Sequence, residues 1–214
     1  KSNKKTPKQK PMKALIIVDP QNDFMPGGAL ETPNGDEIIP MINELQYDFD
    51  LVVASQDWHP RNHMRFASQH SGHEPFQSID VDGEEQTLWP EHCVQGSVGA
   101  EIHPELKMHR IEAVIRKGMD PEIDSYSVFF DKNRERKTGL SGYLKEKGAQ
   151  KLYFCGLATD VCVYYSIMDA LEEGFEAALI TDATRPHEPE RFEDLLSRLE
   201  NKGVEVVQSK ELVE

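Results

Sequence analysis

Six short runs of apolar residues recur along the chain, and each has the length of a strand that is buried on both of its faces. The runs are KALIIVDP (13–20), DLVVASQD (50–57), AVIRKG (113–118), KLYFCGL (151–157), EAALITDA (176–183) and VEVVQS (204–209). A helix that crosses a bilayer needs about 20 apolar residues, and no run approaches that length. The pattern therefore predicts the strands of one central sheet and no membrane partner.

Helical patterns lie between most of these runs. The spacing of apolar positions, and the turn residues that end each segment, predict helices over 36–46, 138–147, 160–173 and 189–202. Strands that alternate with helices form right-handed βαβ units. We therefore expect an α/β fold: a three-layer αβα single domain with a mostly parallel central sheet of about six strands and helices on both faces.

The segment 57–112 interrupts this alternation. It is rich in His, Pro, Gly and Ser, and its apolar residues follow neither the helical nor the strand period clearly. A long irregular segment inside a compact domain is usually functional. We expect part of a binding or catalytic site to lie in it.

The charge of the chain limits its partners. The formal net charge is −14, although residues 1–13 hold six lysines and no acidic residue. An acidic body repels nucleic acid and anionic lipid, so neither is an expected partner. Disorder concentrates at chain ends, and we expect a disordered tail over 1–12 before a domain that spans 13–214.

Three cysteines, Cys93, Cys155 and Cys162, are present without any CxxC pair. A sparse, odd count favours free thiols in a reducing compartment. The basic N-terminal segment also lacks the apolar stretch of a secretory signal. These features predict a cytoplasmic location, and they leave homo-oligomer formation open.

Four chemically capable side chains follow the predicted strands. Asp19 ends the first strand, Asp57 ends the second, Lys117 ends the third, and Cys162 follows the fourth after a short turn. Ligands of an open parallel sheet bind beyond the carboxyl ends of its strands. A structural alternative exists for each residue, because an aspartate can cap a turn and a lysine can be a solvated strand end. Their convergence on one edge nevertheless predicts a site there.

Cys162 and Cys155 have different expected roles. Cys155 lies in the middle of an apolar strand and is expected in the core. Cys162 lies in the first turn of the helix predicted over 160–173, with Asp160 as the expected N-cap, where unpaired N–H groups stabilise a thiolate. Its helical neighbours Ser166 and Asp169 are polar, whereas a packing cysteine would prefer the apolar stripe. We therefore interpret Cys162 as a nucleophile.

A thiol is only slightly ionised at neutral pH and needs a base. Asp19 can take the proton of Cys162, and Lys117 can keep that carboxylate ionised. Backbone N–H groups of the turn 157–162 can form an oxyanion hole. An Asp–Lys–Cys set fits this chain better than a Cys–His–Asn set, for which no arrangement is evident.

The irregular segment carries a second chemical signal. DWHPRNH places Asp57, His59 and His63 within seven residues, and WPEHC adds His92. One aspartate with two or three histidines suits Zn²⁺, Mn²⁺ or Fe²⁺. The alternatives are that these are ordinary surface histidines, or that Cys93 beside His92 is a further ligand.

These residues stand in motifs that resemble the nicotinamidases of the isochorismatase-like cysteine hydrolase superfamily. The matching stretches are IIVDPQNDFMPGGAL (16–30), SQDWHPRNH (55–63), LWPEHCVQGSVGAEIHPEL (88–106), RKGMDPEIDSYSVFFD (116–131) and CGLATDVCVYYSIMDALEEGFEAALITDA (155–183). They follow the order of the family and cover almost the whole chain beyond residue 12. Together the motifs are highly specific, whereas any one alone would not be.

The resemblance implies an activity and a set of site residues. Members of the family hydrolyse nicotinamide to nicotinate and ammonia in NAD salvage, and many also act on pyrazinamide. The implied catalytic residues are Asp19, Lys117 and Cys162; the implied metal ligands are Asp57, His59 and His92; the implied substrate contacts are Phe24, Trp89 and Ala158. His63 stands where only some relatives have a further ligand. The metal, Zn²⁺ before Mn²⁺ or Fe²⁺, would bind the ring nitrogen of the substrate, and a cis peptide is implied at Leu157–Ala158.

Two other functions remain to be distinguished. One is a different amide or ureido hydrolase of the same superfamily, although relatives without the metal lack DWHP and WPEHC. The other is a non-enzymatic protein that binds a metal or senses thiol oxidation, which would leave Asp19 and Lys117 at strand ends by coincidence. Release of ammonia from nicotinamide separates all three.

Overall fold

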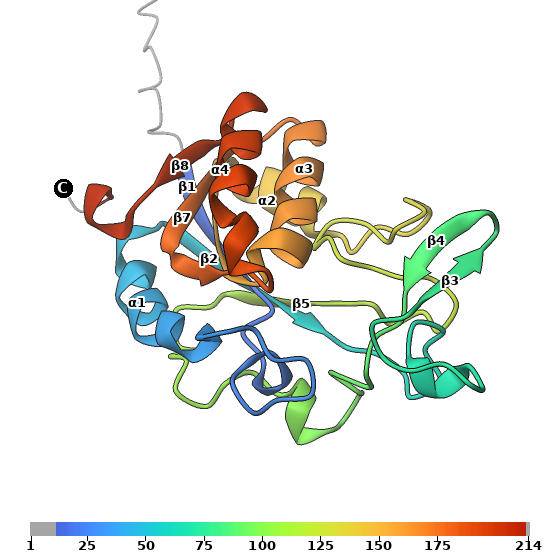
Figure 1. The fold of residues 1–214 in the computed structure, drawn as a ribbon. Helices are drawn as coiled ribbons and strands as arrows, with labels where there is room; N and C mark the ends of the chain where they lie inside the picture. Colours follow the sequence, from blue (N-terminus) through green and yellow to red (C-terminus); the bar gives the residue numbers. More distant parts are fainter. Residues whose placement is uncertain (1–11, 213–214) are drawn as a thin grey trace, which may run out of the picture.

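The computed structural model describes residues 12–212, in which one sheet forms the centre of the molecule (Figure 1). Its strands are β1 (Met12–Val18), β2 (Leu51–Asp57), β5 (Ala113–Lys117), β6 (Ala149–Leu157), β7 (Glu176–Arg185) and β8 (Glu205–Val207). They lie in the order β5-β2-β1-β6-β7-β8, and every pairing is parallel. All six expected strands are thus confirmed, and the sheet is entirely parallel.

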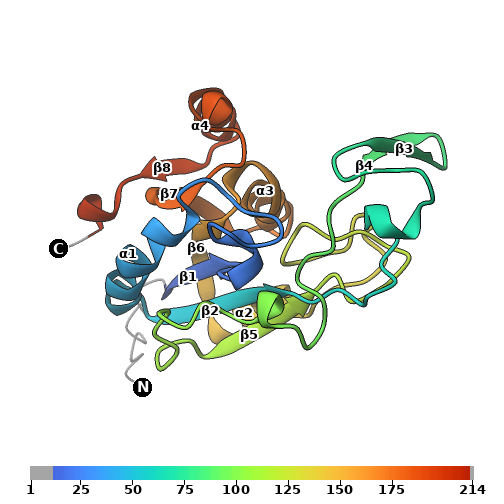
Figure 2. The same cartoon turned by 60° about the horizontal axis from the view of Figure 1, so that its bottom comes forward.

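Helices cover both faces of the sheet (Figure 2). Leu15 and Ile17 pack on the face covered by α1 (Ile38–Leu45). Ala14, Ile16 and Val18 pack on the opposite face, which three helices cover: α2 (Leu140–Lys147), α3 (Tyr164–Glu172) and α4 (Phe192–Asn201). Because successive side chains of β1 enter two cores, the run is continuously apolar, and each buried Leu or Ile contributes about 1.5–3 kcal/mol.

The order of the strands creates a crevice next to β1. From β1 the chain builds outward through β2 to β5, and then returns to the other side of β1 with β6. Neighbouring crossovers therefore diverge between β1 and β6, which is where ligands of such sheets bind. Gly156 lets β6 approach β1 closely there, since a Cβ on it would lie 2.1 Å from the carbonyl oxygen of Val18.

The irregular segment contains a hairpin that the apolar pattern did not predict. Strands β3 (Ser78–Val81) and β4 (Glu84–Thr87) pair antiparallel and project from the main body. Asp82 and Gly83 connect them, both with positive φ, at 56° and 85°. Asp-Gly is a strong hairpin signal, but only β3 alternates apolar with polar residues, at Ile79 and Val81, and β4 is entirely polar, so the apolar pattern is too short to mark the pair.

Two expectations concern the ends and the membrane. Residues 1–11 of the expected tail lie outside the described residues, and Met12 is already the first residue of β1. Among residues 12–212, no helix is long and apolar enough to cross a membrane.

Candidate active site

The sheet brings the four strand-end residues together. Lys117 is fully enclosed, and its Nζ lies 2.9 Å from Oδ2 of Asp19 and 2.5 Å from Oδ1 of Asp57. The same ammonium group donates to Sγ of Cys162 at 3.5 Å. One cation therefore contacts two carboxylates and the thiol, whereas the sequence suggested a partner for Asp19 alone.

Asp19 is held in place by the neighbouring strand. Its backbone N–H donates to Oγ of Ser55 at 3.0 Å, and that hydroxyl donates back to Oδ1 of Asp19 at 2.6 Å. Its φ is 46°, a left-handed conformation that Asp adopts more readily than most residues. Oδ2 of Asp19 faces the Lys117 ammonium group at 2.9 Å and forms a buried ion pair with it.

Cys162 lies in a π-helical turn, Thr159–Val163, that leads into α3. The expected N-cap role of Asp160 is wrong, because its carboxylate instead accepts the N–H groups of His187 and Glu188, each at 2.9 Å. Ser166, interpreted as a polar neighbour of Cys162 away from the apolar stripe, is buried, since its hydroxyl accepts the N–H of Val128 at 3.0 Å and the segment around Val128 covers it.

The electrostatic environment of Cys162 differs from the one expected for an activated thiolate. Burial raises the pKa of the Cys162 thiol well above its usual range; Lys117 lowers it, and the Asp19 and Asp57 carboxylates raise it further. Burial also raises the pKa of Asp19, and Lys117 opposes that effect without cancelling it. With its pKa raised, the Cys162 thiol is protonated at rest, so a reaction at its sulfur would require a base.

A second cluster joins Asp57 to two histidines. Nε2 of His59 lies 3.0 Å from Oδ2 of Asp57, and Nε2 of His92 lies 3.9 Å from the same oxygen. In each ring the other nitrogen donates to a backbone carbonyl, His59 to Gly118 at 2.8 Å and His92 to Pro90 at 2.7 Å. Such bonds fix the ring and leave Nε2 for a metal. The three residues fit a divalent metal ion.

The protonation of the rings matches this interpretation in part. Burial lowers the pKa of His92 to about 3, so this ring is neutral at pH 7. Burial also lowers the pKa of His59, but the Asp57 carboxylate outweighs it and the net change is upward. Burial raises the pKa of Asp57, but Lys117 and His59 outweigh it, and the pKa falls below its usual range.

His63 and Cys93 lie outside the cluster of Asp57, His59 and His92. The ring of His63 lies beside that of His59, at 4.6 Å between centroids. Its Nδ1 accepts the N–H of Arg65 at 3.2 Å, and its Nε2 donates to the carbonyl of Ile123 at 3.3 Å. Both nitrogens are thus already engaged, and neither His63 nor Cys93 belongs to the group that could hold a metal among the described residues.

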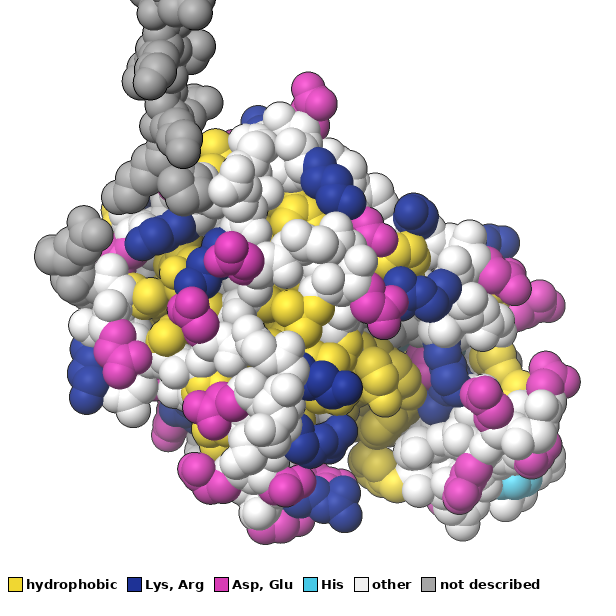
Figure 3. Space-filling model, turned by 90° about the horizontal axis from the view of Figure 1, so that it is seen from above, with side chains coloured by type: hydrophobic (Ala, Val, Ile, Leu, Met, Phe, Trp, Pro, Cys, Tyr) yellow, Lys and Arg dark blue, Asp and Glu magenta, His cyan; other side chains and the backbone are white. Residues whose placement is uncertain are grey.

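A cavity connects the two clusters. Cys162 lies on its wall with the metal-binding side chains, and so do the three predicted substrate contacts, Phe24, Trp89 and Ala158. Hydrophobic side chains gather in a hollow between the main body and the lobe that carries β3 and β4 (Figure 3). The peptide between Leu157 and Ala158 is cis, as the resemblance implied.

Sequence reasoning missed several residues that line the cavity. They are Leu30, Arg65, Asp124, Ser125, Tyr126, Val161 and His187. Tyr126 and its neighbours stand in the quoted motif 116–131, which was the signal available for them. Arg65 and His187 stand in no chemical pattern along the sequence, and only the fold brings them to the cavity.

The isochorismatase domain family matches residues 13–211. The chain belongs to this family. Its curated relatives include a nicotinamidase of Acinetobacter baylyi, 49% identical over 80% of this chain and 80% of the relative. Another is a nicotinamidase of Escherichia coli, 49% identical over 82% of this chain and 84% of the relative.

Several solved structures also resemble the chain. The nicotinamidase/pyrazinamidase of Acinetobacter baumanii superimposes with a TM-score of 0.90 at 43% identity, covering 96% of this chain and 100% of that one. PnC1 of L. infantum in complex with nicotinate gives 0.82 at 39% identity, covering 93% of each chain. The pyrazinamidase of Pyrococcus horikoshii in complex with zinc gives 0.76 at 39% identity, covering 92% of this chain and 99% of that one.

Proposed function

We propose that the protein is a nicotinamidase, which converts nicotinamide and water to nicotinate and ammonia, and that it also hydrolyses pyrazinamide. The observation that carries this proposal is the buried contact of one lysine with Asp19, Asp57 and Cys162 at the wall of a cavity. The 49% identity to two curated nicotinamidases supports the choice of substrate.

Asp19 and Cys162 carry the covalent chemistry in this mechanism. Asp19 takes the thiol proton, and the sulfur attacks the carboxamide carbon to form a C–S bond. Backbone N–H groups near Ala158 and Cys162 bind the oxyanion. Asp19 then gives its proton to the departing ammonia as the C–N bond breaks. A water that loses a proton to Asp19 cleaves the thioester, and nicotinate leaves as the thiol is restored.

The resting charges suit this sequence of proton transfers. The pKa of Asp19 is raised by burial, which brings a carboxylate closer to the range in which it can both accept and return a proton near neutral pH. The pKa of Lys117 is raised because Asp19 and Asp57 outweigh the effect of burial, so its positive charge persists throughout. Lys117 thereby compensates the negative charge that moves between sulfur, oxyanion and carboxylate.

Asp57, His59 and His92 would hold a divalent ion, which we propose is Zn²⁺. One carboxylate and two imidazoles, with further positions open, form a typical zinc ligand set. When bound, the ion would supply a Lewis acid for the ring nitrogen of the substrate. Phe24 and Trp89 would enclose the ring, since both line the cavity.

The test is release of ammonia from nicotinamide by the purified, metal-loaded protein, with nicotinate identified as the second product. We expect turnover of nicotinamide and pyrazinamide, and much less of ureido substrates. A protein that hydrolyses another amide but not nicotinamide would be a different amidohydrolase of the same family. A protein that binds metal and releases no ammonia from any amide would not be an enzyme of this class.

A further inference from the structure

Arg65 is a buried arginine at the wall of the cavity, with only 2% of its surface exposed. Its five N–H donors are all used. Nε and one Nη donate to the carbonyl of Thr87 at 2.8 and 2.5 Å, and that Nη also donates to the hydroxyl of Tyr126 at 3.1 Å. The other Nη donates to Gln86 at 2.7 Å and to Asp124 at 2.5 Å. A planar fork of five donors is specific to arginine.

The partners of Arg65 belong to two separate segments. Gln86 and Thr87 end strand β4, and Asp124 and Tyr126 lie on the loop that follows β5. The residue also acts through its backbone, because its carbonyl accepts the N–H of Trp89 at 2.7 Å. Arg65 thus fixes the chain on both sides of Leu88 and ties it to the loop of Tyr126.

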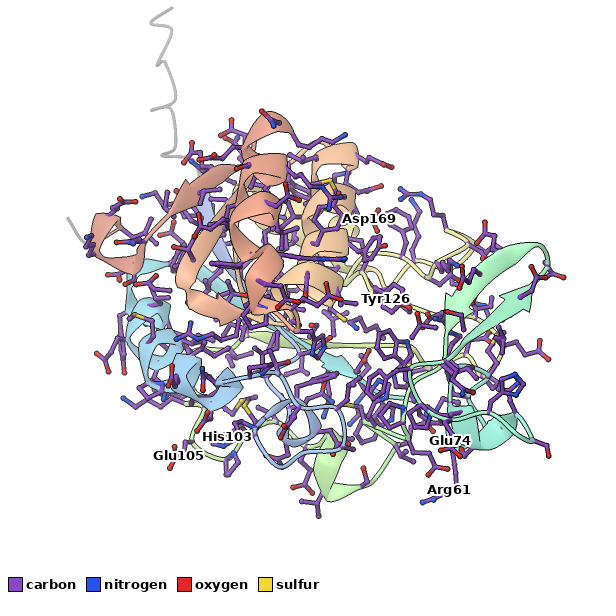
Figure 4. All side chains as sticks on the ribbon, in the orientation of Figure 1. Arg61, Glu74, His103, Glu105, Tyr126 and Asp169 are labelled. Carbon is purple, nitrogen blue, oxygen red and sulfur yellow. The ribbon has the colours of Figure 1, made fainter. Side chains whose placement is uncertain are left out.

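Both segments carry an aromatic side chain to the cavity. Trp89 lines it from one segment and Tyr126 from the other. Tyr126 stacks on Tyr165 of α3, with ring centroids 5.3 Å apart and planes at 22°. Figure 4 shows Tyr126 between α3 and the lobe that carries β3 and β4. The placement of these two aromatic side chains relative to each other therefore depends on what joins the lobe to the loop.

We propose that Arg65 is a positioning residue for the substrate, which fixes the places of Trp89 and Tyr126 on the wall of the cavity against which a flat pyridine ring binds. This inference rests on the proposed nicotinamidase function. The hydrogen bonds of the Arg65 side chain go to the wall segments and not to Cys162 or to the metal-binding residues. It should therefore control how well the ring is bound more than how fast the bound amide reacts.

The decisive variant is Arg65→Lys, which keeps the charge opposite Asp124 but cannot reproduce the fork. We expect the KM for nicotinamide to rise about tenfold while kcat falls less than about threefold, because loss of positioning outside the reacting atoms weakens binding first. The dissociation constant for nicotinate, measured by calorimetry, should rise by a similar factor. Metal content should stay at the wild-type level.

Arg110→Met is the matched control. The Arg110 guanidinium also ties backbone carbonyls, those of Gln46 at 2.9 Å and Phe49 at 3.2 Å, but it lies away from the cavity. This variant should lower the melting temperature without changing KM. If Arg65→Lys does not fold, Tyr126→Phe, which removes the hydroxyl that Arg65 holds, is measured in its place with the same expected rise in KM.

Two kinetic results would overturn the inference. They are an unchanged KM in the folded variant, whether or not kcat falls, and a rise in KM that Arg110→Met reproduces. Failure of the proposed function is recognised separately, since wild-type protein would then release no ammonia from nicotinamide. Binding of nicotinate to wild type and to Arg65→Lys needs no turnover, and equal dissociation constants would still reject the role of Arg65.

Discussion

The two halves of the site are built in different ways. Asp19, Lys117 and Cys162 stand at the ends of strands or after the short turn that follows a strand, and Lys117 contacts both of the other side chains. His59 and His92 stand on the irregular segment, and backbone carbonyls hold their rings: that of Gly118 after β5 for His59, and that of Pro90 in the same segment for His92. The first half takes its geometry from the sheet, and the second takes it from hydrogen bonds to loop carbonyls.

The halves meet at Lys117 and Gly118. Lys117 pairs with the metal-binding Asp57, and the carbonyl of the next residue, Gly118, orients His59. Gly118 has a φ of 68°, and a Cβ there would lie 2.4 Å from the His59 ring. The end of β5 therefore couples the nucleophilic half to the metal half, so damage to one half can reach the other through this strand.

The largest expected effect is loss of the nucleophile. Cys162→Ala should lower kcat by about 10⁴-fold or more, as removal of a covalent nucleophile does in other hydrolases. Metal content and melting temperature should change little, since the metal half does not depend on the thiol. Steady-state ammonia release and metal analysis check both statements.

Cys155→Ser is the control for this variant. Cys155 is buried with its sulfur 3.8 Å from the carbonyl of Ile16, and it faces the core under α1. It should lose about 1–3 kcal/mol of stability, because a hydroxyl enters an apolar core, and keep its activity. Retention of even a tenth of the wild-type activity by Cys162→Ala would remove the nucleophile assignment.

The next effect is expected for Asp19→Asn. General base catalysis contributes about 10²–10⁴-fold, and the raised pKa of Cys162 makes a base more necessary. The variant should also react more slowly with iodoacetamide at neutral pH. If the thiol of this variant is alkylated at the wild-type rate and the variant keeps most of its activity, Asp19 is not the base. Another group of the strand-built half must then accept the proton.

Lys117→Met should lower kcat about 10²-fold, because the transition state loses the stabilising charge of the ammonium group. It should also move the acid limb of the pH–rate profile to higher pH. Lys117 lowers the pKa of Asp19, so without it the carboxylate protonates at higher pH and ceases to be a base earlier on acidification. Lys107→Met, at an exposed ion pair, is the control, and an unmoved acid limb would contradict this pairing.

The strand-built half could be predicted from the sequence, and the reason is topological. Apolar runs located β1, β2, β5 and β6, and the edge rule for parallel sheets selected Asp19, Asp57, Lys117 and Cys162 from their ends. The contacts that surround these residues were not predicted. Neither the coverage of Ser166 by the loop at Val128 nor the sharing of Lys117 with Asp57 has a local signal, because both depend on distant segments.

The loop-built half was found by residue type and by resemblance, not by pattern. Spacing placed His59 near Asp57, but nothing in the spacing distinguished His92 from His63 as the third ligand. That distinction depends on which ring nitrogen meets a carbonyl, and the carbonyls come from Pro90 and Ile123. Arg65 was missed because the four residues that its side chain contacts are remote in sequence.

Metal removal tests the loop-built half directly. Chelation should abolish hydrolysis of nicotinamide, and Zn²⁺, Mn²⁺ or Fe²⁺ should restore it. Binding of nicotinamide should weaken more than binding of benzamide, which has no ring nitrogen; equal losses would show that the metal does not recognise that nitrogen. His92→Ala should weaken metal binding more than about 100-fold, since it removes a ligand and not only its support.

The smallest effect is expected for His63→Ala, and this variant best distinguishes a metal ligand from a residue that supports one. Both ring nitrogens of His63 are engaged by the backbone, and burial lowers its pKa to about 4, so the ring is neutral at pH 7 and its removal changes no charge. The ring still packs beside His59, so metal affinity should fall less than about tenfold, in the range for a supporting residue. Metal titration of His63→Ala beside His92→Ala measures the difference. A loss for His63→Ala as large as that for His92→Ala would mean that the His63 ring turns to bind the metal, and that hydrogen bonds to loop carbonyls do not select the ligands of this half.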